Sequence, residues 1–188
     1  ASYMAFHTRA NGGNPTERLR INSSGRLLIG STVESSHGGI DSALQIIGTG
    51  TDDTSITLSR FDNSVHSPYI AFAKSRNGSI GGNTVVQDGD SLGRMTFFGN
   101  DGTDGNTPAA EIDIEIDGTP GSNDMPGRIV LRTTSDGAST TSERMRIRSD
   151  GHVQLQHGLT GLSGGGVIVC AAKSSSGTAN QSNYKVDF

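Results

Sequence analysis

Four carboxylates in the middle of the chain have a spacing that could bind a cation. They are Asp113, Glu115, Asp117 and Asp124. They fall at positions one, three, five and twelve of a stretch with glycine at position six, which is how calcium-binding loops gather oxygen ligands. However, Ile114 and Ile116 alternate with the acids as they would in a β-strand. We therefore favour a solvated acidic strand face, with a bound ion as the weaker alternative.

Arginines recur at alternate positions of a second motif. Arg144, Arg146 and Arg148 follow one another with the same spacing as Arg18 and Arg20, which places guanidinium groups on one face of a strand. Such a ladder could hold a sulfated or phosphorylated glycan, because guanidinium groups bind those anions bidentately. We favour the simpler interpretation, in which the arginines pair with acids on a neighbouring strand or chain.

The remaining reactive residue types have no distinctive spacing. The five histidines are His7, His37, His66, His152 and His157. They form no His-x-His metal pair, and no two acids stand out as the carboxylate pair of a glycoside hydrolase. The one G-x-S-x-G match, Gly161 to Gly165, lies in a Gly-rich connector with no apolar strand before it, so we do not interpret it as a nucleophile motif, and no phosphate-binding glycine loop occurs. Cys170 lies in an apolar run and is predicted to be an inert buried thiol. The sequence therefore predicts no catalytic residue, no cofactor and no enzyme.

The composition predicts a β-rich chain with a thin core. Leu, Ile, Val and Phe supply 39 of 188 residues, close to the level of about 20% below which chains tend towards disorder. Yet the net charge is only −4 and the apolar residues alternate with polar ones, so we infer that other chains complete the core. With 15 basic and 19 acidic residues, a nucleic-acid partner is not expected. No apolar run is long enough for membrane insertion.

One short motif that must position the arginines occurs twice. Residues 17–27 read ERLRINSSGRL and residues 143–153 read ERMRIRSDGHV. In each copy, apolar residues alternate with arginines and are followed by a turn ending in glycine. Each copy therefore predicts a strand, a tight turn and the start of a second strand.

Other alternating stretches predict strands along the whole chain. They cover residues 3–7, 43–47, 56–61, 69–73, 93–97, 111–117, 127–131, 167–172 and 184–188. The pairs Asn11-Gly12 and Asn77-Gly78 predict hairpin turns, because both residue types tolerate a positive φ. No stretch has convincing helical periodicity, so the sequence predicts an all-β protein.

The chain divides into four segments by this pattern. We predict a first β repeat segment at 1–34, a β segment with long polar loops at 35–92, a second β repeat segment at 93–157, and a Gly/Ser-rich connector with the start of a further β segment at 158–188. The last strand pattern stops before it is complete, so we expect the sequence to be part of a longer protein.

Three segments in this order resemble tail-fibre proteins of tailed bacteriophages, especially marine ones. They are the repeated E-R-[LM]-R-I-x-S-x-G motif, GDSLGRMTFFGNDGT at 89–103, and DGTPGSNDMPGRIVL at 117–131. The resemblance covers most of residues 2–155. It implies a homotrimeric β-fibre on the virion, outside the cell, that extends towards the host surface and helps attach to it.

We therefore predict an all-β fold, in the form of an elongated, intertwined trimeric fibre of β-helix or β-prism type with short strands and Gly- and Asp-rich turns. The partners are two identical chains, with host surface glycan as a further ligand. Apolar strand faces are expected to meet at the threefold axis. The residues predicted for this trimer core are Leu19, Ile21, Leu27, Ile112, Ile114, Ile116, Met145 and Ile147. The alternatives are a glycan-degrading tailspike enzyme and a cellular extracellular β-filament or adhesin subunit.

Overall fold

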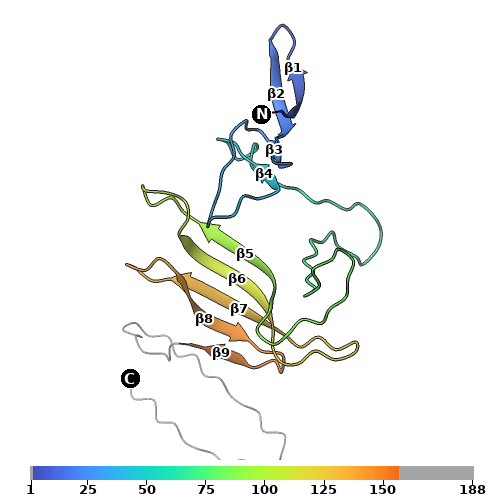
Figure 1. Ribbon diagram of the computed structural model, residues 1–188, viewed down its shortest axis with the longest axis vertical. Helices are drawn as coiled ribbons and strands as arrows, with labels where there is room; N and C mark the ends of the chain where they lie inside the picture. Colours follow the sequence, from blue (N-terminus) through green and yellow to red (C-terminus); the bar gives the residue numbers. More distant parts are fainter. Residues whose placement is uncertain (1, 157–188) are drawn as a thin grey trace, which may run out of the picture. The chain divides into compact units, whose positions relative to one another are not determined.

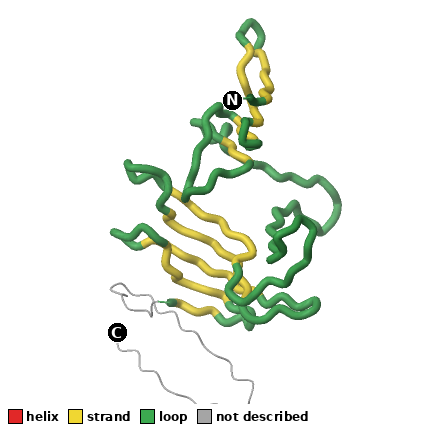
Figure 2. The backbone as a smooth tube through the Cα atoms, viewed as in Figure 1, coloured by secondary structure: helices red, strands yellow, loops and turns green. Residues whose placement is uncertain are grey.

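The computed structural model describes residues 2–156, and every regular element in them is a β-strand (Figures 1 and 2). The strands in this part of the chain are β1 (Met4–Arg9), β2 (Pro15–Ile21), β3 (Leu27–Ile29), β4 (Leu44–Ile46), β5 (Ser91–Phe98), β6 (Pro108–Ile116), β7 (Gly127–Thr134), β8 (Thr141–Ile147) and β9 (Val153–Leu155). The all-β prediction is confirmed for these residues. No helix in them is long and apolar enough to cross a membrane. The predictions for 158–188, including Cys170, lie outside the described residues.

The first sheet has the strand order β1-β2-β3-β4. β1 and β2 form an antiparallel hairpin whose turn contains Gly12 with a φ of 77°, so the hairpin predicted at Asn11-Gly12 is confirmed. β3 pairs antiparallel with β2, whereas β4 runs parallel to β3. Leu28 is fully buried. Oε1 of the buried Gln45 side chain accepts the backbone N–H of Ser35 at 2.9 Å, and its Nε2 donates to the carbonyl of Ser42 at 3.2 Å, so both polar atoms of this side chain are paired.

The second sheet is an antiparallel meander with the order β5-β6-β7-β8-β9 (Figure 1). The strands predicted at 93–97, 111–117 and 127–131 form its first three members. Its fully buried apolar side chains include Ile116 and Val130. The chain before β5 closes over the end of β6, because the backbone of Ile116 exchanges hydrogen bonds of 2.9 and 3.0 Å with Asp90 and Gly89.

The duplicated motif has the same local structure in both sheets. In the first copy Phe6 pairs with Leu19 and His7 with Glu17, so Arg18 is the extra residue of a β-bulge. Leu131 pairs with Met145 and Arg132 with Glu143 in the second copy, so Arg144 is the extra residue there. Each bulged arginine donates from Nε to a threonine hydroxyl of the preceding strand, at 2.8 Å to Thr8 and 2.9 Å to Thr133. Each copy of the sequence motif therefore forms the same β-bulge.

Two predicted strands do not form. Residues 56–61 and 69–73 are not in a strand, and the described residues between β4 and β5 contain no strand at all. Alternation of residue types alone does not make a strand, because a strand also needs a hydrogen-bonded neighbour, and none of the described chain provides one. The hairpin predicted at Asn77-Gly78 is also wrong, since Asn77 Oδ1 accepts the N–H of Ser79 in a local turn instead.

Candidate functional site

β6 separates a charged face of the second sheet from an apolar one. Glu111, Asp113 and Glu115 are buried on one face. On the other face, Ile112 and Ile114 are 38% and 37% exposed. The prediction of a solvated acidic face is therefore wrong, because the acids are covered by arginines and the isoleucines are the more exposed residues. We define these two surfaces as the charged face and the apolar face.

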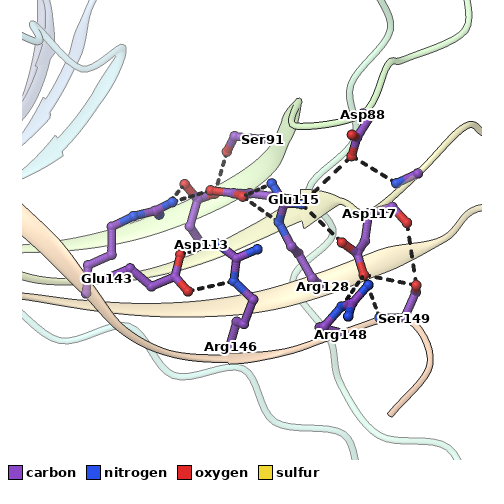
Figure 3. A network of polar contacts seen from close by, with 12 residues as sticks. Asp88, Ser91, Asp113, Glu115, Asp117, Arg128, Glu143, Arg146, Arg148 and Ser149 are labelled. Carbon is purple, nitrogen blue, oxygen red and sulfur yellow. Dashed lines mark hydrogen bonds and ion pairs between the residues drawn. The ribbon is translucent and has the colours of Figure 1, made fainter. Parts of the chain in front are cut away.

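The carboxylate of Asp113 is surrounded by donors from both neighbouring strands (Figure 3). Arg94 on β5 donates from Nη2 to Oδ2 at 2.6 Å, and Arg132 on β7 donates from Nη1 to the same oxygen at 2.9 Å. Ser91 donates its hydroxyl to Oδ1 at 2.6 Å. Among the described residues, no buried side-chain nitrogen or oxygen lacks a hydrogen-bond partner. A fully buried charge is tolerated here because it is paired in this way.

The same network of hydrogen bonds and ion pairs extends along β6 to Glu115 and, just after the strand, to Asp117 (Figure 3). Arg128 donates from Nε to Glu115 Oε2 at 2.8 Å and from Nη1 to Asp117 Oδ1 at 3.1 Å. Arg132 donates to the other oxygen of Glu115. Ser149, in the turn after β8, donates its backbone N–H to Asp117 Oδ2 at 2.9 Å. The charged face thus ties β5, β6, β7 and the turn after β8 together.

The pKa values of these carboxyls follow from their donors. Burial alone would raise the pKa of Asp113, but the hydrogen bonds from Ser91 and Arg94 and the charges of Arg94 and Arg132 outweigh it, so its pKa lies below the ordinary value. The pKa of Asp117 is lowered to about 2, first by the backbone N–H of Ser149 and then by the hydrogen bond from Arg128. Both carboxyls are therefore held as anions at neutral pH.

Three of the four acids with calcium-like spacing come together on the charged face. Asp113, Glu115 and Asp117 already accept hydrogen bonds from arginines. Asp124 lies apart in the β6–β7 loop, where its backbone bridges to Gly121. Within residues 2–156, no three His, Cys, Asp or Glu side chains are grouped so that they could hold a metal ion.

The second arginine of each motif copy is bound by the glutamate of the same copy. Arg146 donates from Nε and Nη2 to the two oxygens of Glu143 at 2.6 and 2.5 Å. Arg20 makes the same bidentate pair with Glu17 at 2.5 and 2.8 Å. These hydrogen bonds lower the pKa of both glutamates. Sequence reasoning expected a partner on another strand, although the Glu three residues earlier in both copies was the available signal.

The three arginines of the predicted glycan ladder have different surroundings. Arg144, the extra residue of the β-bulge, donates a hydrogen bond to the Thr133 hydroxyl, and Arg146 donates to the Glu143 carboxylate. Arg148 is about half exposed and makes only long contacts, of 3.9 Å to Asp117 and 3.8 Å to Asp150. The three side chains therefore do not form one continuous basic surface.

The apolar face of the second sheet consists of two rows of side chains that cross all five strands. The first row is Met95, Ile112, Leu131, Met145 and Leu155, and the second is Ile114, Ile129, Ile147 and Val153, starting from Gly93. Residues directly opposite one another in a sheet point to the same face. We call these two sets the apolar rows of the second sheet.

The first sheet has the same arrangement. Its apolar rows are Met4, Ile21, Leu27 and Leu44 in one set and Phe6, Leu19, Ile29 and Ile46 in the other. Seven of the eight residues predicted for a trimer core belong to the rows of the two sheets. Ile116 does not, because it is fully buried within its own chain and has no surface left for another. Sequence reasoning missed Met95, Ile129 and Leu131, which the alternation at 93–97 and 127–131 could have indicated.

The fold is similar to that of a phage fibre domain. No family model matches the sequence, and a search of curated proteins finds no match. The carboxy-terminal domain of the bacteriophage T5 L-shaped tail fibre aligns with a TM-score of 0.68 at 17% identity, over 95% of this chain and 74% of that one. The same domain with its intramolecular chaperone domain aligns with a TM-score of 0.70 at 17% identity, over 95% of this chain and 52% of that one. The chain therefore shares the all-β fold of this tail-fibre domain.

Proposed function

We propose that the chain is a structural segment of a homotrimeric tail fibre of a tailed bacteriophage. It belongs to the virion, lies outside the cell, and extends towards the host surface, where it helps the particle attach. The fold likeness to the T5 tail-fibre domain and the repeated sequence motif both support this role. The marine source to which the motifs point remains part of the proposal.

The observation that carries the proposal is the exposure of the apolar rows. Soluble monomers rarely leave a contiguous apolar patch of this kind uncovered. The charged face is already closed by arginines, so the apolar rows are the surface that still needs a partner. Each large aliphatic side chain that passes from half exposed to buried contributes roughly 1 kcal/mol.

Three copies of the chain can meet this need with one symmetry operation. If each copy turns its apolar rows towards a common axis, the rows become the inner faces of a β-prism and the charged faces become its outer wall. The described chain already offers two such sheets, one at each copy of the motif. An intertwined trimer with a sparse core in each chain therefore agrees with the composition.

The carboxylates support a structural role over catalysis. A glycoside hydrolase needs one carboxyl whose pKa is raised so that it can donate a proton. In the described chain, each Asp or Glu with a displaced pKa has it lowered, by arginine, serine or backbone donors. We therefore propose that the segment is not an enzyme and uses no cofactor.

Host glycan is the second partner in this proposal. Arg146 is engaged by Glu143, so the part of the motif that the sequence offered for anion binding serves the sheet instead. Contact with host glycan would then come from exposed loops of the fibre rather than from a basic ladder.

Oligomeric mass tests the proposal directly. Sedimentation equilibrium of the full chain should give three times the chain mass. The double change Ile114→Ser with Leu131→Ser should raise the concentration needed for half-assembly at least about tenfold, since about 1.4 kcal/mol corresponds to that factor. Val65→Ser is the matched control, because Val65 is 99% exposed and lies outside the rows. A monomeric wild-type chain would overturn the proposal, and cleavage of host polysaccharide by the purified protein would favour a tailspike enzyme.

A further inference from the structure

Two stretches of the chain have a strand-like sequence pattern but belong to no sheet. In residues 55–61, Ile56 and Leu58 alternate with polar residues, and in residues 67–73, Ile70 and Phe72 alternate with alanines. Across residues 2–156, no hydrogen bond involves the backbone N–H or C=O groups of either stretch. Each stretch is seven residues long, which is an ordinary length for a β-strand.

The side chains of these stretches are also unusually exposed. Phe61 is 96% exposed, Ile56 67% and Ile70 62%. A lone extended chain with apolar side chains in water gains neither ladder hydrogen bonds nor burial, and it is not stable by itself. The stretches therefore have the properties of strands whose partner belongs to another molecule.

The two stretches do not satisfy each other. Residues 57–60 and 67–69 line one open groove, yet no backbone hydrogen bond crosses it. The turn between them is fixed by Asp62, which accepts the backbone N–H of Ser64 at 3.1 Å and its hydroxyl at 2.8 Å. This turn holds the stretches near each other without pairing them, so within residues 2–156 no partner takes up their backbone groups, which are available to another chain except at Pro68, which has no N–H.

The second stretch reaches the apolar rows at its end. Phe72 lies against Gly93, the first position of the second row, and lines a small apolar pocket with Met95 and Ile112. In the proposed trimer this face turns towards the neighbouring copies. Residues 67–73 would then reach the boundary between chains, where a strand from the next copy can meet them.

We propose that residues 55–61 of one copy pair by backbone hydrogen bonds with residues 67–73 of the next copy, an inference that rests on the proposed trimer. Such an interface joins two different surfaces, and a threefold rotation closes it into a ring in which every stretch has a partner. Strand exchange of this kind removes free strand edges and makes the segment between β4 and β5 part of the assembled fibre.

Mixed-chain cross-linking tests this pairing. All chains carry Cys170→Ser so that the native thiol does not interfere. One chain carries Thr57→Cys and the other Ala71→Cys, and the two are produced together and oxidised. The pairing predicts a disulfide between the two chains, identified by mass spectrometry of the linked peptides. Ser24→Cys, in an exposed turn of the first sheet, replaces Thr57→Cys in the matched control and should give no disulfide with residue 71.

Hydrogen exchange of the full chain without substitutions provides a second measurement. Paired amides in 55–61 and 67–73 should exchange at least about a hundredfold more slowly than those of the 99–107 loop, as expected for strands in a stable sheet. A trimeric mass with fast exchange and no cross-chain disulfide would overturn the strand exchange and leave the proposed function standing. A monomeric mass would overturn both.

Discussion

Phe72 takes the place of the side chain that Gly93 lacks. A Cβ built on Gly93 would lie 2.6 Å from Cβ and 2.8 Å from Cγ of Phe72, far inside van der Waals contact. Every other position in the second apolar row carries a branched aliphatic residue, and Gly93 alone leaves room for a residue from elsewhere in the chain. The glycine is therefore a docking position for residues 67–73, and a sequence-local argument could only have read it as a weak point in a strand.

Gly93→Ala should destabilise the protein by displacing Phe72. The added methyl group meets the start of an aromatic side chain, which cannot give way without moving its backbone, so we expect a loss of about 1–3 kcal/mol. Denaturant unfolding at fixed protein concentration measures it. Gly99→Ala is the control, since a Cβ at Gly99 meets nothing within 4 Å. Phe72→Ala should remove most of the penalty of Gly93→Ala, because the two residues share one contact. Full additivity in this double-mutant cycle would contradict the docking.

Arg132→Met should cost more than any other single arginine change on the charged face. Arg132 donates to Asp113 and Glu115, and its loss leaves two buried carboxylates short of a partner. Breaking a buried ion pair costs about 3–5 kcal/mol. Because Arg94 still holds Asp113, we expect the lower part of that range in the free energy of unfolding.

The control for this change is Arg148→Met. Arg148 is about half exposed and its ion-pair distances are 3.8 and 3.9 Å, so the expected effect is within about 0.5 kcal/mol. If both variants lose the same free energy of unfolding, the buried ion-pair network does not stabilise the sheet.

The alternation of residue types predicts which residues share a face of a strand, but not which face meets water. Alternation correctly predicts that Ile112 and Asp113 lie on opposite faces of one strand. It wrongly predicts that the acids are exposed to solvent. Local spacing does not reveal that Arg94 on β5 and Arg132 on β7 lie beside Asp113 and cover it. Burial of a charge depends on strand register, and register is a long-range property.

Pairing has the same limit. The stretches 56–61 and 111–117 both predict strands by alternation, yet only the second forms one, as part of β6. An alternating pattern specifies an extended backbone, and hydrogen-bonded neighbours convert it into a sheet. Where the neighbour belongs to another copy, as we propose for 55–61, the structure of a single chain does not contain the pairing.

Stability should fall in acid because carboxyls on the charged face have depressed pKa values. An unfolded Asp has a pKa near about 4, whereas that of Asp117 is lowered to about 2. Between these two pKa values the unfolded chain binds more protons than the folded one, so the free energy of unfolding falls as the pH falls from about 4 to about 2. Above this window the stabilising contribution of the Asp117 carboxylate is complete. Thermal melting from pH 6 to pH 2 measures the fall.

Asp117→Asn tests the source of this pH dependence. The amide cannot titrate, so the slope of stability against pH between about 4 and 2 should decrease. Asp136→Asn, in the exposed β7–β8 turn, is the matched control. An unchanged slope in Asp117→Asn would place the acid sensitivity elsewhere in the chain.

The bidentate Glu–Arg pair of the duplicated motif should stabilise both sheets independently. Arg20→Lys and Arg146→Lys keep the charge, but an ammonium group cannot reach both glutamate oxygens in the plane that a guanidinium offers. Arg146→Lys should lower the free energy of unfolding by about 1 kcal/mol, and Arg20→Lys should lower it as well. The two losses should add, because the pairs share no residue. Arg20→Lys should lower the free energy of unfolding slightly more than Arg146→Lys does, since the Arg20 guanidinium also stacks 4.3 Å from the ring centroid of Tyr3.

Two comparisons distinguish the pair from a general effect of replacing arginine. Arg148→Lys, which has no bidentate partner among the described residues, should be nearly neutral. Glu143→Gln should cost less in the Arg146→Lys background than in the wild type, because the shared interaction is already weakened. If Arg146→Lys has as little effect as Arg148→Lys, the pair between Arg146 and Glu143 does not stabilise the β-bulge of the motif. The conformation of the bulge would then depend on Arg144 and its hydrogen bond to Thr133.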